Sequence, residues 1–149
     1  MTQLKTEARA KGDTILKKSF PKEHDYLVND LAPFCQEMSD AIIDHAYGKI
    51  WARDELSKRM RSLVTVVSLA AVGGNDNVLR IHIKAAFSHR CTLEELRESF
   101  LHMHLYVGFP KAVAALTVLR EVVTEMAGGK DIKDFESDPS AFIPEEQMR

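Results

Sequence analysis

The sequence has few cysteines, and they are widely spaced. Its 149 residues contain only Cys35 and Cys91, which form no C-x-x-C pair. A disulfide framework or a zinc site needs more thiols at closer spacing, so we expect neither. The scarcity of cysteine favours a reducing, cytoplasmic location.

The sequence also lacks an excess of either charge and a long apolar run. Its 20 Lys and Arg face 22 Asp and Glu, which gives a net charge of −2 and no basic cluster for nucleic acid. The longest apolar run, residues 63–73, is interrupted by Thr65 and Ser68 and is too short to cross a bilayer. The first residues show no apolar segment of a signal peptide. We therefore expect neither a nucleic-acid nor a membrane partner.

Period-2 alternation of the kind that marks strands is absent, and apolar residues recur at helical spacing instead. The sequence predicts an all-α fold of about six helices. Its length suits one domain, residues 1–149, with a core at about 25–127. Residues 130–149 are acidic and contain two prolines, so we expect an irregular arm, in which Phe135, Phe142 and Ile143 are able to dock on another surface.

Capping residues set the expected helix boundaries. Pro21 ends the first helix, Gly48 closes the second, Asn75 or Asp76 caps the fourth, and Thr92 opens the fifth with a T-x-x-E capping box. The third helix is apolar around most of its circumference, so it is either central or covered by another subunit. The expected helices span about 2–19, 24–47 (with Pro33 at a start or kink), 54–73 (with Asp54 or Ser57 at its start), 75–88, 92–107 and 110–128.

A histidine interrupts the apolar fourth helix. On a helical wheel His82 falls within the apolar arc, and His89 lies almost beneath it at i+7, whereas Arg80 and Lys84 lie on the other side. One interpretation is a core histidine that is hydrogen-bonded to the backbone or a tyrosine. The other is a desolvated imidazole with a lowered pKa that transfers a proton.

The last turns of the fifth helix contain three polar side chains in an apolar setting. His102, His104 and Tyr106 resemble the lining of a pocket, although His102 could instead pair with Glu98 on the surface. His102 and His104 do not share a helix face, and His82 and His89 are two turns apart. No carboxylate completes a metal-binding set, so we expect no metal site.

Three blocks of sequence carry a family resemblance. The stretch Y-G-K-I-W-A-R-D-E-L followed by R-M-R-S-L-V-T resembles the Y-G-x-x-W-x-R-x-x-L and R-x-R-S-L-x-T elements of the carboxymuconolactone decarboxylase family. The stretch L-R-I-H-I-K-A-A resembles its L-x-x-H-x-x-A-A block, and Y-V-G-F-P-K-A resembles its Y-x-G-x-P-x-A. The blocks extend over about residues 25–123 in the family's order.

The resemblance implies an alkyl-hydroperoxidase D-like helical fold and a homo-oligomer, a trimer or, more typically, a hexameric ring. It implies removal of CO₂ from a small carboxylated lactone in aromatic breakdown, with no metal or organic cofactor. The family histidine corresponds to His82, and Trp51, Arg53, Arg61 and Tyr106 match other family positions.

These matches suggest a division of roles. Arg53 and Arg61 would anchor carboxylates, Tyr106 or a second histidine (His102 or His104) would donate to an oxyanion, and His82 would deliver a proton to carbon. Substrate-binding roles are expected for Arg53, Arg61, Trp51, His104 and His89. The alternative for the arginines is ion pairing with Asp54, Glu55 or Glu121.

Some positions depart from the family pattern. Val78 stands where a glutamate is common four residues before the histidine, and Ser88-His89-Arg90 replaces N-N-G. His104 replaces an alanine. These changes favour two alternatives: a divergent enzyme of another proton-transfer type (isomerase, dehydratase or cyclase), or a non-catalytic binding oligomer. A thiol peroxidase is not expected, because neither cysteine has a resolving neighbour.

Overall fold

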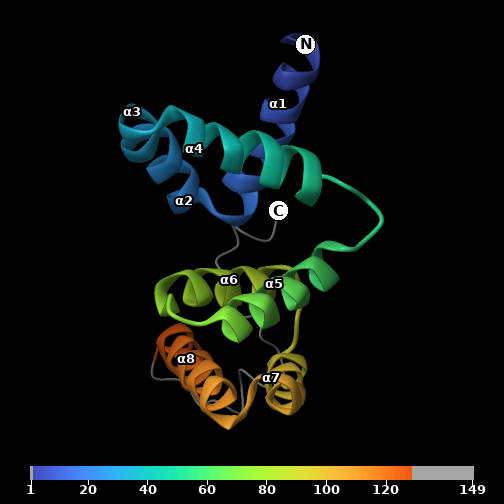
Figure 1. The fold of residues 1–149 in the computed structure, drawn as a ribbon, viewed down its shortest axis with the longest axis vertical. Coiled ribbons are helices and arrows are strands. Elements are labelled where there is room, and N and C mark those ends of the chain that lie inside the picture. The colour runs from blue at the N-terminus through green and yellow to red at the C-terminus, as the bar shows by residue number, and fades with distance from the viewer. Residues whose placement is uncertain (1, 129–149) are drawn as a thin grey trace. The chain divides into compact units, whose positions relative to one another are not determined.

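The computed structural model describes residues 2–128, with side chains from residue 7 onward (Figure 1). All regular elements within that range are helical, which confirms the all-α class. The helices form two compact units, Met1–Ser57 and Lys58–Arg149. The expected arm at 130–149 lies outside the described residues, and a single domain stays a prediction.

The first unit is built around two helices that pack on each other. Its elements are α1 (Thr2–Ser19), α2 (Pro21–Tyr26), η1 (Leu27–Leu31), α3 (Ala32–Phe34), α4 (Gln36–Asp40) and η2 (Ala41–Trp51). Phe20, at φ −146°, separates α1 from α2, and Pro21 occupies the first turn of α2, as proline prefers. Arg9 of α1 forms ion pairs with Asp40 and Asp44, and its Nε lies 2.6 Å from Asp44 Oδ1. These pairs fasten α1 to the α4–η2 segment.

Two glycines allow α1 and η2 to approach closely. A Cβ added to Gly48 would lie 2.0 Å from the Ala8 carbonyl oxygen, and one added to Gly12 would lie 2.1 Å from that of Ile43. The prediction that Gly48 closes its helix is wrong, because η2 continues to Trp51. Gly48 is required at that position by the backbone of a neighbouring helix, which no local pattern of the sequence reveals.

The expected helix at 24–47 is divided into shorter segments. Cys35, at φ −151°, interrupts it two residues after Pro33, and π-helical turns replace regular α-helix on both sides. The Ser39 hydroxyl, which is fully buried, donates to the Leu27 carbonyl at 2.9 Å and joins the segments across the break. The proline has no N–H for the helical ladder, which explains why regular helix is lost near it.

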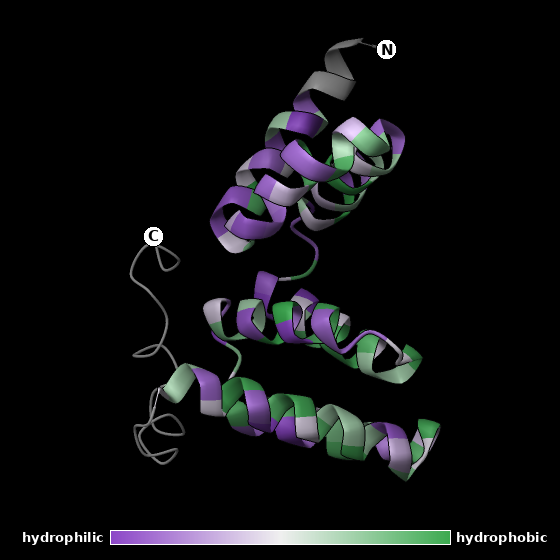
Figure 2. Cartoon of the chain, turned by 90° about the vertical axis from the view of Figure 1, so that its left-hand side faces the viewer, coloured by the Kyte–Doolittle hydropathy of each residue, from purple (hydrophilic) through white to green (hydrophobic). Residues whose placement is uncertain are grey.

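The second unit contains four longer helices: α5 (Lys58–Val72), α6 (Asp76–Ser88), α7 (Leu93–Val107) and α8 (Phe109–Ala127). In Figure 1, α5 and α6 lie side by side and pack against α7 and α8. The hydrophobic core lies between them, and hydrophobic residues predominate along α8 (Figure 2). The fully buried large side chains of this core are Val66, Ile83, Phe87, Leu96, Phe100, Leu119 and Val122.

The caps of these helices are those that the sequence predicts. Asn75 Oδ1 accepts a hydrogen bond from Val78 N at 3.1 Å and caps α6. Thr92 and Glu95 exchange both bonds of a capping box at the start of α7. Gly128, at φ +56°, follows the end of α8 in the left-handed conformation that suits glycine.

Part of the apolar surface of α5 is exposed. Met60, Val64 and Val72 are 43%, 52% and 79% exposed, whereas Val66 and Ala70 are buried on the opposite side. The sequence predicts that this helix is either central or covered by another subunit, and coverage of the exposed side by a subunit stays a prediction. Within residues 2–128, no helix combines the length and the hydrophobicity that a transmembrane span requires.

Candidate active site

His82 lies in the middle of α6, three residues after Leu79 and directly before Ile83, both of which are buried. Its own side chain is partly buried, as the helical wheel predicts. Burial, with a smaller contribution from the nearby charge of His89, lowers the pKa of His82 to about 4. The imidazole is therefore neutral near pH 7, when it can donate through one nitrogen and accept through the other.

The surroundings of His82 on α6 are divided into an apolar side and a charged side. Val78, one turn earlier on the same face, places an aliphatic group where a carboxylate would change the charge of the imidazole. Arg80 forms an ion pair with Glu121 of α8, and Lys84 Nζ lies 2.7 Å from Glu125 Oε1. These pairs join α6 to α8 along the charged side.

His89 occupies the C-cap of α6 and is bound by a residue of another helix. Its Nδ1 lies 2.7 Å from the hydroxyl of Ser62, a residue of α5 that is 1% exposed. This bond forms in a nearly dry environment and fixes the orientation of the imidazole. Sequence analysis missed Ser62, although it lies within the R-M-R-S-L-V-T block.

The chain turns sharply after His89, in a Schellman motif. Cys91 N donates to Ala86 O at 2.9 Å and Arg90 N donates to Phe87 O at 2.8 Å, while Arg90 adopts φ +66°. Arg90 thus takes the left-handed conformation that the glycine of an N-N-G sequence adopts without strain. The turn is retained in spite of the substitution, and it holds His89 at the helix end.

The same turn is fastened to the start of α5 by Arg59. Its Nε donates to Arg90 O at 3.2 Å, and its guanidinium forms an ion pair with Glu95 of α7. Cys91 is buried beside this arginine, and burial raises the pKa of its thiol to about 11. A thiol in that state is a poor nucleophile at neutral pH.

The two residues of the W-x-R element belong to the first unit and have partners there. Trp51 stacks on Tyr47 with a centroid distance of 5.7 Å and meets Phe20 edge-on at 6.2 Å. The Nε and Nη2 atoms of Arg53 donate to the carboxylate of Glu55 at 3.1 and 2.9 Å on an exposed surface. The ion pair considered for Arg53 is therefore present. Substrate binding by either residue stays a prediction.

Arg61 directly precedes Ser62 on α5 and is partly buried, with its Nε shielded from solvent. It belongs to the same compact unit as His82 and His89. Of the two arginines predicted to anchor a carboxylate, Arg53 and Arg61, only Arg61 belongs to the unit that contains the Ser62–His89 bond. Its role in binding a carboxylate stays a prediction.

The remaining predicted residues lie at the end of α7. His102 and the ring of Tyr106 are exposed and lie 5.4 Å apart, and His104 stacks on Phe109 at 4.7 Å. His104 Nδ1 also bonds the carbonyl of Leu101. Within one chain these side chains form a surface rather than an enclosed lining.

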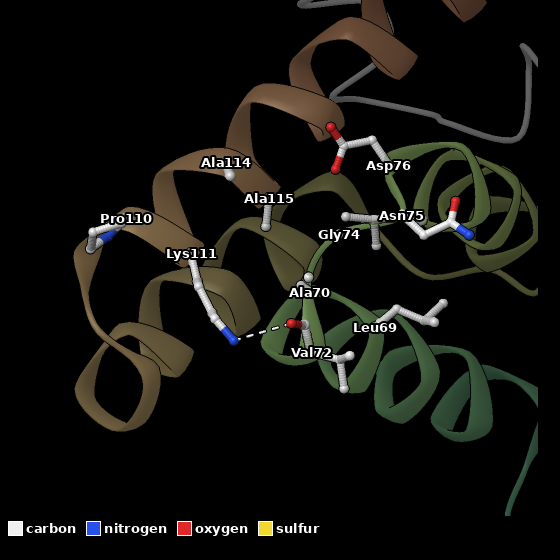
Figure 3. Close-up of a pocket in the computed structure, with 12 residues that line it drawn as sticks. Leu69, Ala70, Val72, Gly74, Asn75, Asp76, Pro110, Lys111, Ala114 and Ala115 are labelled. Atoms are coloured by element: carbon white, nitrogen blue, oxygen red, sulfur yellow. Dashed lines mark hydrogen bonds between the residues drawn. The ribbon is translucent and has the colours of Figure 1, made fainter.

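The described part of the second unit contains at least two pockets. The larger, about 290 Å³, lies between the end of α5, the start of α6 and the start of α8. Figure 3 shows Lys111 pointing toward the end of α5, where its Nζ donates to Ala71 O and, at 3.1 Å, to Val72 O. The smaller, about 70 Å³, lies between α7 and α8. Neither pocket is lined by His82, so the cavity that we expect beside the imidazole stays a prediction.

Among the described residues, no three His, Cys, Asp or Glu side chains are grouped to hold a metal ion. In the described part of the second unit Ser62 is hydrogen-bonded to His89, His82 lies seven residues before His89 on α6, and Arg61 is adjacent to Ser62 in sequence. Such a group can hold an anion, donate hydrogen bonds and move a proton.

Comparison with known proteins agrees with this chemistry. The model of the carboxymuconolactone decarboxylase family matches residues 36–121. A 4-carboxymuconolactone decarboxylase from Acinetobacter baylyi is 37% identical over 99 residues, which are 66% of this chain and 73% of the relative. A nitrosuccinic acid decarboxylase from Metarhizium robertsii is 29% identical over 114 residues, 73% of this chain and 78% of the relative.

Both relatives are named as decarboxylases, which supports the prediction of a decarboxylase-type enzyme. The family match covers more than half of the chain and includes the α5–α6 region with Ser62, His82 and His89. On these grounds the chain belongs to the carboxymuconolactone decarboxylase family.

Proposed function

We propose that this protein is a cofactor-free decarboxylase of a small organic acid, with His82 as the group that protonates carbon. The observation that carries the proposal is a partly buried imidazole, neutral near pH 7, in the middle of α6 and within the residues that the family model matches. A cytoplasmic location and a role in aromatic breakdown, with a carboxylated muconolactone as substrate, belong to the proposal.

The names of the relatives define a substrate class. Carboxymuconolactone and nitrosuccinic acid each combine a carboxylate with an electron-withdrawing group, a conjugated lactone carbonyl or a nitro group. Loss of CO₂ leaves an electron pair that such a group accepts, so the protein needs to stabilise an oxyanion and supply one proton. We infer that the substrate of this chain has the same two features.

The proposed mechanism uses residues of the second unit first. Arg61 binds a carboxylate that does not react, because a guanidinium matches that group with two hydrogen bonds. The C–C bond to the leaving carboxylate breaks and its electrons move into the acceptor group. His82, which is neutral in the empty site, becomes a stronger base beside the bound anion and holds the proton that it gives to carbon.

A homo-oligomer is also part of the proposal. Leu105, Tyr106 and Phe109 are 65%, 76% and 71% exposed, and exposed large apolar side chains that lie close together in the chain are typical of a protein–protein interface. Covering it with a second copy would enclose Tyr106, His102 and His104 and allow them to act as donors to the oxyanion. A trimer or a hexameric ring, with an alkyl-hydroperoxidase D-like arrangement of helices, is the expected assembly.

Measurement of CO₂ release tests the proposal. The purified protein is given 4-carboxymuconolactone, nitrosuccinate and a panel of related lactone and keto acids, beside His82→Asn and the control His45→Gln. His45 is exposed and lies in the first unit. We expect His82→Asn to lower kcat by about 10²-fold or more, because general acid–base catalysis contributes that much, and the control to be unchanged. Equal rates for all three proteins would refute the role of His82.

The same panel separates the alternatives that Val78 and His89 favour. Consumption of an acid without CO₂ would indicate isomerisation, dehydration or cyclisation at the same site. Binding without turnover, retained in His82→Asn, would indicate a binding oligomer. Peroxide reduction at Cys91 is disfavoured by the raised pKa of its buried thiol.

A further inference from the structure

The smaller pocket forms a cleft between α7 and α8 that the proposed mechanism does not use. Three apolar residues that are at most 3% exposed contribute to its lining: Leu93, Leu119 and Val123. The partly buried Leu116 and Arg97 and the exposed Arg120 complete it. The volume of this α7–α8 cleft, about 70 Å³, is far below the roughly 300 Å³ at which small-molecule sites begin. The cleft therefore suits one apolar side chain of a polypeptide rather than a substrate or a cofactor.

The charge around the α7–α8 cleft is positive. The described residues that line it include two arginines and no carboxylate. Glu121 and Glu125 of α8 form ion pairs with α6, and Glu95 of α7 forms one with Arg59 of α5, so these carboxylates are directed toward other helices. An apolar interior with a positive rim matches an apolar side chain that has acidic neighbours.

The cleft lies near the end of α8, where the arm begins. Only Gly108 separates α7 from α8, and the cleft brings the first turns of α7 beside the last turns of α8, so the two helices run antiparallel. Val123 and Leu119 precede Gly128 by five and nine residues, which is about 8 and 14 Å along the helix axis. Gly128, at φ +56°, ends the helix and turns the chain away from that axis. The residues after Gly128 therefore start close to the cleft.

One apolar residue of the arm has the neighbours that such a cleft requires. Phe135 is flanked by Asp134 and Glu136, and residues 134–146 contain five carboxylates and no basic residue. Phe135 follows the last described residue by seven positions, and an extended chain of that length spans about 23 Å, which exceeds the distance to the cleft along α8. The family model ends at residue 121, so this segment lies outside the family match.

We propose that the arm of this chain docks in its own α7–α8 cleft, with Phe135 as the side chain that enters it. The two carboxylates beside Phe135 then face the two arginines of the rim, where ionised partners form strong hydrogen bonds. The docked ring covers the apolar residues of the cleft and joins the arm to both helices. This contact is independent of the reaction that the protein catalyses.

Limited digestion of the full-length protein with chymotrypsin tests whether Phe135 is docked. The arm offers two aromatic cleavage sites, Phe135 and Phe142, and a synthetic peptide of residues 129–149 gives their cleavage ratio in the undocked arm. Relative to Phe142, we expect cleavage after Phe135 to be about tenfold slower in the protein than in the peptide, because the protease cleaves only the open form. Equal ratios in the protein and the peptide would overturn the proposal.

Charge reversal tests whether the α7–α8 cleft is the place of docking. Arg120→Glu should restore rapid cleavage after Phe135, and the addition of Glu136→Arg should slow it again, because the ion pair re-forms with its charges exchanged. Each protein is compared with a peptide that carries the same change in the arm. Lys22→Glu, an equal change of charge at an exposed residue of the first unit, should keep the wild-type ratio.

The charge-reversal result also has a clear negative outcome. Arg120 is exposed, so its substitution should leave the helical core intact, which circular dichroism checks. Glu136→Arg alone changes no described helix and should also speed cleavage after Phe135. Wild-type ratios in both single variants would show that the arm does not dock in this cleft.

Cross-linking identifies whose arm occupies the cleft. In a Cys35→Ser background, Thr124→Cys places a thiol on the exposed side of α8 one turn after Arg120, and Ser137→Cys places one beside the acidic segment, with no change of charge. A short bis-maleimide should join the two thiols within one chain, seen as a single-chain mass with one linker on a denaturing gel and in mass spectrometry. Products of twice that mass would assign the cleft to the arm of a second copy and overturn the proposal.

Discussion

Substitution of His82 by glutamine should remove the acid sensitivity that this buried histidine gives to the protein. Burial lowers the pKa of His82 from 6.5 to about 4 in the folded chain. Between those two values the unfolded chain binds a proton that the folded chain does not. Lowering the pH through this window therefore favours unfolding, and stability rises again as the pH returns toward 7.

The magnitude follows from the two pKa values. At a pH below both pKa values, protonation of His82 lowers the free energy of unfolding by about 3 kcal/mol. This is the difference between the unfolded and folded pKa values multiplied by 1.36 kcal/mol per pKa unit. Between pH 7 and pH 5, where the unfolded histidine is almost fully charged and the folded one is mostly neutral, the loss is about 2 kcal/mol. Glutamine cannot be protonated there, so the His82→Gln protein should lack this loss.

Urea titrations at pH 7, 6 and 5, followed by circular dichroism, measure this difference. For each protein, the change in the free energy of unfolding between pH 7 and pH 5 is determined. The value for His82→Gln is then subtracted from that for the wild type, so that the contributions of the other titrating groups cancel. The fluorescence of Trp51, the single tryptophan, reports on the first unit and gives an internal control. Parallel pH dependence of wild type and variant would refute the claim that His82 is desolvated.

Three further predictions concern stability and thiol reactivity. Arg90→Gly should raise the free energy of unfolding by up to about 1 kcal/mol in urea titrations, because Arg90 has φ +66°, whereas Arg90→Val should lower it. Gly48→Ala should cost about 3 kcal/mol, seen as an earlier transition of tryptophan fluorescence, because its Cβ would lie 2.0 Å from the Ala8 carbonyl oxygen. At pH 8 a thiol reagent should label Cys91 only after unfolding, because its buried thiol has a pKa of about 11. The partly exposed Cys35 should react in the folded chain. Equal labelling rates for the two cysteines would contradict the burial of Cys91.

Local signals in the sequence predict the second unit well. The caps at Asn75 and Thr92 depend on side chains that bond backbone groups three residues away, so sequence spacing alone identifies them. The inward direction of His82 follows from helical periodicity in the same way. In the first unit, Gly48 looks like a helix terminator, but its role is set by Ala8, forty residues away. No local pattern contains that information.

In the candidate site, too, contacts within one helix can be predicted from the sequence and contacts between helices cannot. That His82 and His89 share one face follows from the sequence, because both residues lie on α6. Ser62, the partner of His89, cannot be predicted from the sequence, since its bond to His89 joins α5 to α6 across 27 positions. Trp51 and Arg53 look like site residues by motif, yet the structure provides them with partners in the first unit, Tyr47 among them.

The exchange of a carboxylate for an aliphatic side chain at position 78 has a consequence for substrate choice. A glutamate one turn before His82 would stabilise the protonated imidazole in the empty site. With Val78 there and His89 two turns beyond His82, the surroundings on α6 favour the neutral ring. The negative charge that makes His82 a proton carrier then has to arrive with the substrate. A monoester that keeps only the leaving carboxylate would bring one negative charge fewer to the imidazole, so the enzyme should discriminate against it in kcat as well as in KM.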